Sequence, residues 1–209
     1  MSVSITDLRP WIACNFELDM HPSFYEKIFP ECLRSLQRFT NPRLRYKLQI
    51  FAANKLQLLA IPPESLEHPY LKLLQYTPSK WLCLKKALGA IYCAQEIKQI
   101  IQSQQQNEIS AFLSPKLYHW VLQQGPFYMP LFSDLETPCQ EESLVAKIDL
   151  VGKFLLEYLW TQQSEALQQR FTLKFAKNET WNFRHVIDPN LQTKIYNFIC
   201  RFVESYRKD

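Results

Sequence analysis

Glycine is scarce in this chain, whose 209 residues contain only three: Gly89, Gly125 and Gly152. Glycine supplies the positive-φ corners of tight β-turns and lets a backbone approach a bound phosphate closely. Its scarcity argues against a β-sandwich and against a phosphate-binding loop. In agreement, the sequence contains neither a G-x-x-x-x-G-K-[ST] nor a G-x-G-x-x-G motif.

Paired metal ligands are missing as well. None of the six cysteines forms a C-x-x-C pair, and no cysteine stands within four residues of any of the four histidines. Structural zinc sites use Cys and His ligands at short turn or helix spacings. We therefore expect no metal and no cofactor, and we interpret the cysteines as buried free thiols of a protein in a reducing cytosol.

The sequence also lacks a signal-peptide-like start and any long uncharged apolar run, so we expect no direct membrane insertion. A nucleophile beside a histidine and an orienting acid is not apparent. His185 does precede Asp188, but Asp188 is well explained as a helix cap. We therefore expect no catalytic residue, and a protein that is not an enzyme.

What the chain does have is a high share of hydrophobic residues, 47%, and an aromatic share of 14%, enough for a packed core. Its prolines often follow a residue whose side chain can cap a helix. Such a side chain accepts an orphan backbone N–H, while proline at the first helical position loses no hydrogen bond. Five pairs follow this rule: Asn41-Pro42, Thr77-Pro78, Ser114-Pro115, Thr137-Pro138 and Asp188-Pro189. Five helix starts are thus predicted.

Apolar spacing after these prolines supports helices. Leu44, Leu48, Phe51 and Leu58 follow Pro42 on one predicted helical face. Gly125-Pro126 reads as the stop signal of the helix that begins after Ser114. Ser23 and Glu26 read as a capping box that opens a short helix ending near Pro30. The predicted fold class is mainly α, a compact multi-helix single domain covering residues 1–209.

Two segments depart from this pattern. Residues 170–176 and 181–187 alternate apolar and polar side chains across a short connector, which favours a small β-hairpin near residues 170–187. The alternative is an extended arm that lies across the helices. The glutamine-rich segment 102–107 is expected to be a loop or a helix end.

Formal charge is +4, from 24 basic and 20 acidic residues. A dedicated nucleic-acid binder usually concentrates its positive charge more strongly. Arg43, Arg45 and Lys47 are basic residues at alternate positions, but on a helix the three spread around the axis. We therefore do not expect nucleic acid as a partner.

Four short patterns, in the same order along the chain, resemble those of one known family. The first, near the N-terminus, ends in His21-Pro22; the second is a central Leu88-Gly89; the third is a Gly125-Pro126-aromatic step; and the last combines Arg170 with Leu173-Lys174. With the chain length, this order is similar to that of the SctK/YscK family, accessory proteins of the bacterial type III secretion sorting platform.

The resemblance implies a mostly helical cytosolic protein without enzymatic activity. Such proteins join the cytoplasmic domain of the SctD-type inner-membrane ring protein to the SctQ-type pod protein, and the SctL-type stator is a possible further partner. The chain would then lie in the cytoplasm, peripheral at the cytoplasmic face of the inner membrane when docked. The matching positions are expected to be structural or to contact a partner: His21, Pro22, Leu88, Gly89, Gly125, Pro126, Arg170, Leu173 and Lys174.

Two other hypotheses remain open from the sequence. A helical nucleic-acid-associated protein is suggested by the basic residues 43–47. A thiol-dependent enzyme is suggested only by the number of cysteines, and we consider it the weaker of the two.

Overall fold

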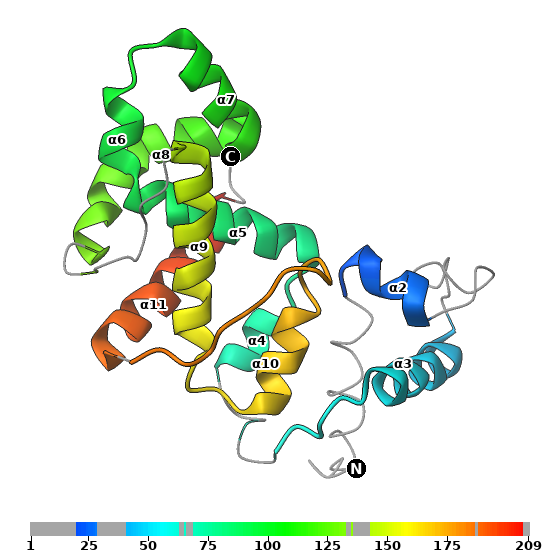
Figure 1. Cartoon of the computed structure of the whole chain (residues 1–209). Coiled ribbons are helices and arrows are strands. Elements are labelled where there is room, and N and C mark those ends of the chain that lie inside the picture. The colour runs from blue at the N-terminus through cyan, green and yellow to red at the C-terminus, as the bar shows by residue number, and fades with distance from the viewer. Residues whose placement is uncertain are drawn as a thin grey trace. The chain divides into compact units, whose positions relative to one another are not determined.

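A computed structural model describes residues 20–28, 41–62, 65, 69–132, 135, 143–186 and 188–206. Within these residues the chain is all-α, as predicted (Figure 1). The elements are α2 (Pro22–Ile28), α3 (Pro42–Leu56), α4 (Tyr70–Leu74), α5 (Pro78–Tyr92), α6 (Ala94–Gln99), α7 (Ser103–Leu113), α8 (Pro115–Tyr128), the short 3-10 helix η4 (Met129–Phe132), α9 (Leu144–Trp160), α10 (Glu165–Thr172) and α11 (Pro189–Tyr206).

Four of the five predicted capped prolines begin helices, namely α3, α5, α8 and α11. Asn41 Oδ1 accepts the N–H of Arg43 at 3.0 Å. Ser114, Thr77 and Asp188 accept backbone N–H groups in the same way. The fifth pair, Thr137-Pro138, lies outside the described residues.

The first described helix begins two residues earlier than the predicted capping box implies. α2 starts at Pro22, and the Nδ1 atom of His21 accepts the N–H of Ser23 at 3.2 Å. His21 therefore takes the capping position that we had assigned to Ser23. Proline suits the first helical position, so the helix starts at Pro22, toward the N-terminus from Ser23.

The chain divides into two compact units, each made of two segments. Unit 1 comprises residues 1–81 and 162–181, and unit 2 comprises residues 82–161 and 182–209. The sequence shows no linker at these boundaries, and a single domain over residues 1–209 stays a prediction.

Unit 1 is held together by apolar and aromatic side chains. α2 packs on α3, and α10 packs on α4. Met20, Tyr25, Ile28, Ala52 and Leu173 form one buried cluster. A second, aromatic cluster centres on Phe171, whose ring lies 5.1 Å from those of Trp81 and Phe175 and 5.0 Å from that of Trp181, centroid to centroid. Edge-to-face contacts of this kind suit the charge distribution of aromatic rings.

Unit 2 is built around the long helix α9, which packs against α7 and α11 and crosses α5 (Figure 1). The α5–α9 crossing is close because Gly89 and Gly152 face each other there without side chains. α8 packs against α6 and α7. Trp120 of α8 joins α11 through an edge-to-face contact with Phe202, the ring centroids lying 4.9 Å apart.

The β-hairpin predicted near residues 170–187 is wrong. Residues 170–172 complete α10, residues 173–175 turn, and residues 181–186 carry no regular secondary structure. Phe171, Leu173 and Phe175 are buried as their alternation suggested. A helix end followed by a turn, packed into the aromatic cluster, places them there without a strand. The alternative of an extended arm fits residues 181–186.

The stop signal predicted at Gly125-Pro126 is also wrong, because α8 continues to Tyr128. A residue that precedes proline is disfavoured in the helical region, because the Cβ atom of that residue clashes with the proline ring. Gly125 has no Cβ, so the helix can pass through Pro126 for one further turn. The Met129 N–H then donates to the Gly125 carbonyl.

Candidate functional site

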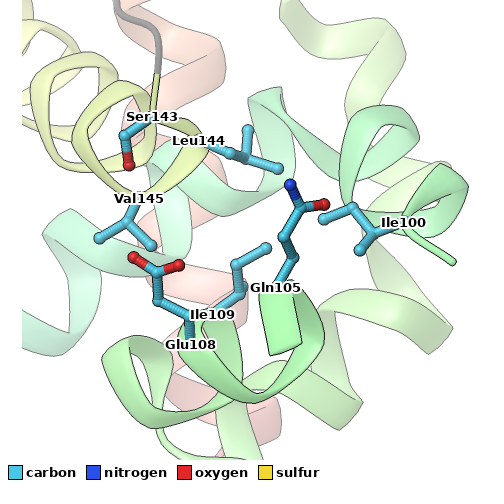
Figure 2. A pocket seen from close by; sticks show the side chains of 7 residues that line it. All are labelled: Ile100, Gln105, Glu108, Ile109, Ser143, Leu144 and Val145. Carbon is cyan, nitrogen blue, oxygen red and sulfur yellow. The ribbon is translucent and has the colours of Figure 1, made fainter. Parts of the chain in front are cut away.

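A pocket of about 380 Å³ opens in unit 2 between α7 and the start of α9 (Figure 2). Its apolar lining comes from Ile100, at the end of α6, from Ile109 on α7, and from Leu144 and Val145 on α9. Its polar lining consists of Gln105, Glu108 and Ser143. This volume is at the lower end of those that hold small molecules.

Local sequence explains how α7 supplies one wall. Gln105, Glu108 and Ile109 are spaced three and four residues apart, so they project from one face of the helix. Ile109 is buried, whereas Gln105 and Glu108 are exposed at the rim. From the first turn of α7, Gln106 Nε2 donates to the Ile100 carbonyl oxygen at 2.8 Å. That bond braces the connection between α6 and α7.

The opposite wall is the first turn of α9. Ser143 stands at the N-cap position with an extended backbone, and its side chain makes no capping hydrogen bond. The helix start is fixed instead by the Lys147 N–H, which donates to the Ser143 carbonyl at 2.9 Å. Lys147 also pairs with Glu96 of α6 at 2.6 Å, Nζ to Oε1, a bond that raises the pKa of this lysine. α6 and α9 are thereby tied together beside the pocket.

The pocket offers an apolar interior with one carboxylate, one amide and one hydroxyl at its edge. Such a surface suits an apolar group that carries a hydrogen-bond donor or a positive charge. Nucleophilic catalysis would need Ser143 beside a base such as histidine. The seven lining residues include no histidine, cysteine or lysine.

The part of the chain that the structure describes gives little support for metal binding or for thiol catalysis. Among those residues, no three His, Cys, Asp or Glu side chains gather closely enough to hold a metal ion. Burial raises the pKa of the Cys83 thiol, and this effect outweighs the opposing influence of Lys86 and of a hydrogen bond with Tyr206. A catalytic thiolate needs the opposite shift.

The most enclosed ionisable cluster of α9 surrounds Glu157. Its Oε1 atom accepts the N–H of Asn182 at 2.8 Å, and its Oε2 atom lies 3.3 Å from His185 Nε2. Lys153 Nζ lies 3.7 Å from Oε1. These contacts hold the extended residues 182–186 against α9, and they use both carboxylate oxygens. We interpret the cluster as a structural clasp.

The structure places five of the nine family-matching positions in unit 1. His21 and Pro22 start α2, and the His21 N–H donates to the Leu173 carbonyl at 2.6 Å. Arg170 is buried, and its Nη1 atom donates to the carbonyls of Leu59 at 2.7 Å and Ala166 at 2.9 Å. Lys174, in the turn that follows α10, is also buried. The N-terminal and C-terminal patterns thus meet within one unit.

The other four positions lie in unit 2. Leu88 is fully buried within α5, next to Gly89 at the crossing with α9. Gly125 faces Ala94 of α6, where an added Cβ would lie 3.0 Å from the alanine Cβ. Pro126 is half-buried inside α8. The two glycines therefore permit close helix contacts, and neither has a positive φ.

Next to these positions, Phe127 is an aromatic side chain that the unit leaves in water. It is 76% exposed, although it stands in the last turn of α8 between the half-buried Pro126 and Tyr128. Tyr128 by contrast stacks on Trp120, with ring centroids 5.8 Å apart. Exposed aromatic residues on rigid helices are frequent anchors of protein interfaces.

The sequence did not reveal the pocket. Gln105 falls in the segment 102–107, predicted as a loop or a helix end, which instead opens α7. Only the apolar pair Ile109 and Leu113, four residues apart and both buried, signalled a helix there. A pocket between two helices depends on how they pack, and spacing within either one does not encode it.

Comparisons with protein-family models, with curated proteins and with solved structures find no match for this chain. Of the helices described, none has both the length and the apolar character that a bilayer crossing requires.

Proposed function

We propose that this protein is a non-enzymatic adaptor of the bacterial type III secretion sorting platform. It links the cytoplasmic domain of an SctD-type inner-membrane ring protein to an SctQ-type pod protein, and it docks peripherally at the cytoplasmic face of the inner membrane. The partner identities rest on the ordered sequence patterns that resemble the SctK/YscK family.

The observation that carries a binding role is the pocket between α7 and α9. Its apolar interior and its rim of Gln105, Glu108 and Ser143 suit the side chain of a partner, with Glu108 facing a donor or a cation. Anchor side chains that fill such pockets supply most of the binding free energy of many interfaces. Phe127 offers the reverse arrangement, because it is an exposed aromatic side chain that can enter a pocket on a partner protein.

The placement of the matching positions supports a scaffold role for them in this proposal. Gly89 and Gly125 stand where two helices approach closely, and the His21–Leu173 bond joins the first pattern to the last. The surfaces that meet partners are then free to lie elsewhere on the two units.

The test measures binding of the full-length chain to a purified SctD-type cytoplasmic domain and to a purified SctQ-type pod protein by biolayer interferometry. Val145→Trp places a large side chain in the pocket, and Val186→Trp adds the same side chain at a position that is 97% exposed. We expect Val145→Trp to weaken binding to at least one of the two proteins by about tenfold or more. Val186→Trp should bind like the wild type.

Two results would count against the proposal. If the folded wild-type chain binds neither protein, the adaptor assignment is wrong. If it binds them and Val145→Trp, with an unchanged circular dichroism spectrum, binds equally well, the pocket is not the contact.

A further inference from the structure

The outer face of α3 in unit 1 combines cationic and apolar side chains. Three large apolar residues, Leu44, Ile50 and Phe51, are 36%, 37% and 41% exposed. Beside them the exposed cationic residues are Arg43, Lys47 and Lys55. At 100° per residue these six side chains and Asn54 occupy a continuous arc of roughly 140°. We call this arc the α3 face.

Negative charge is absent from this helix. The 15 residues of α3, PRLRYKLQIFAANKL, contain four basic residues and no aspartate or glutamate. The chain as a whole has almost as many acidic as basic residues, 20 against 24. All charged side chains of the helix are therefore positive, in a protein whose overall charge is nearly balanced.

Among the described residues, the core contacts of α3 come from side chains outside the α3 face. Ala52 is buried in the cluster formed with Met20, Tyr25, Ile28 and Leu173, and Leu48 and Leu56 pack against it. The sequence predicted that Leu44 and Phe51 would share one helical face with Leu48, without saying which part of that face is buried. They lie on the exposed side, so the apolar pattern of this helix is wider than its own core requires.

The helix presents this face preformed. Asn41 caps its N-terminus, and at its C-terminus the Gln57 N–H bonds to the carbonyls of Ala53 and Asn54. Lys55 Nζ lies 5.7 Å from the centroid of the Phe51 ring, which keeps the cation above the aromatic surface. A partner would not have to order the helix before binding, and that ordering would otherwise lower its affinity.

We propose that the α3 face is a docking site for an acidic amphipathic helix of a partner protein. Carboxylates spaced three or four residues apart on that helix would face Arg43, Lys47 and Lys55. Its apolar side chains would cover Leu44, Ile50 and Phe51. Complementary charge sets the orientation and speeds association, and burial of the apolar residues supplies the affinity. This inference stands on unit 1 alone and goes beyond the platform assignment.

A helix fits this face better than a bilayer or a nucleic acid. The apolar residues keep roughly three-fifths of their surface covered, so they lie nearly flush and cannot penetrate far into lipid. Interfacial membrane helices separate an apolar side from a basic side, whereas here cations and apolar residues are mixed within one arc. A phosphate backbone would leave the apolar residues uncovered.

The experiment uses the full-length chain and a synthetic amphipathic peptide of about four helical turns, with glutamate and leucine on one face. Binding is measured by fluorescence anisotropy and located by amide chemical shifts. We expect the shifts to concentrate on α3. Lys47→Glu and Phe51→Ser should each weaken binding by about tenfold or more. Lys194→Glu is the matched control, because this exposed lysine of α11 carries the same change of charge.

A charge swap makes the test specific. A second peptide with lysine in place of glutamate should not bind the wild type, and it should bind Lys47→Glu better than the wild type does. The proposal is overturned if the acidic peptide fails to bind the folded chain, or if its shifts lie outside α3. It is also overturned if vesicles of phosphatidylglycerol, or a DNA duplex, bind through Lys47 while the peptide does not.

Discussion

Replacing Gly89 with alanine is expected to destabilise unit 2 severely, although alanine is the better helix former. An ideal Cβ on Gly89 would lie 2.8 Å from the carbonyl carbon of Ile148 in α9 and closer still to its oxygen. These are backbone atoms of a packed helix, so no side-chain rotation can relieve the overlap. α5 and α9 would have to move apart along the whole of their contact.

The magnitude follows from two opposing terms. Overpacking a core costs about 1–3 kcal/mol, and a clash with backbone belongs at the upper end of that range. Alanine returns about 1 kcal/mol through its higher helix propensity. We therefore expect Gly89→Ala to lower the free energy of unfolding by about 2 kcal/mol or more. Gly152→Ala should act alike, because its Cβ would lie 2.9 Å from the carbonyl carbon of Lys85.

Gly125 provides the matched control. There an added Cβ would meet the Cβ of Ala94 at 3.0 Å and Cγ1 of Val121 at 3.5 Å, contacts that a shift of a few tenths of an ångström relieves. The new Cβ would also meet the ring of Pro126, and the gain in helix propensity offsets part of these two local costs, so Gly125→Ala should cost about 1 kcal/mol. Urea unfolding followed by circular dichroism compares the variants. The reasoning is refuted if Gly89→Ala is as stable as Gly125→Ala.

Two mutational experiments and one measurement of thiol reactivity test other groups. Arg170→Met removes the donor to the Leu59 carbonyl and should cost about 2 kcal/mol in urea unfolding, and no change would contradict the role of that bond. A double-mutant cycle between Lys147 and Glu96 should give a coupling of about 0.5 kcal/mol that weakens with added salt. Because the pKa of Lys147 is raised above 10.5 in the folded state, this coupling is present at neutral pH and is lost as the pH rises through that raised pKa, and a coupling already lost near neutral pH would contradict it. Cys83 should react slowly with iodoacetamide at pH 8, with a rate midpoint above its ordinary pKa of 9.0, whereas a midpoint near 7 would revive a thiol mechanism.

Helix starts were the most predictable feature of the fold. The signal is local: a side-chain oxygen followed by proline fixes where a helix can begin, as at Asn41 and Ser114. Helix ends were less predictable. Gly125-Pro126 has the composition of a stop, yet Gly125, which has no Cβ, lets α8 continue through Pro126 and packs closely on Ala94. A glycine that allows close packing and a glycine that ends a helix look the same in a sequence.

Alternation between residues 170 and 187 shows a second limit. It correctly marked Phe171, Leu173 and Phe175 as buried, but it did not fix the backbone that buries them. A strand needs a partner strand for its hydrogen bonds, and the period of the side chains does not reveal one. In the arm, Asn182 bonds instead to the carboxylate of Glu157. Burial was thus predictable here, and secondary structure was not.

The helix α3 shows the same limit of sequence patterns for a functional surface. Its apolar spacing predicted one stripe through Leu44, Leu48 and Phe51, and the stripe is present. Spacing reports only that side chains repeat along a helix face, and says nothing about what covers them. In the fold Leu48 turns toward the core, while Leu44 and Phe51 lie outside among cations. An apolar repeat that exceeds the needs of its own core is where a surface for another protein should be sought, and the four basic residues of α3, with no acid beside them in the helix, are the reason we propose an acidic partner.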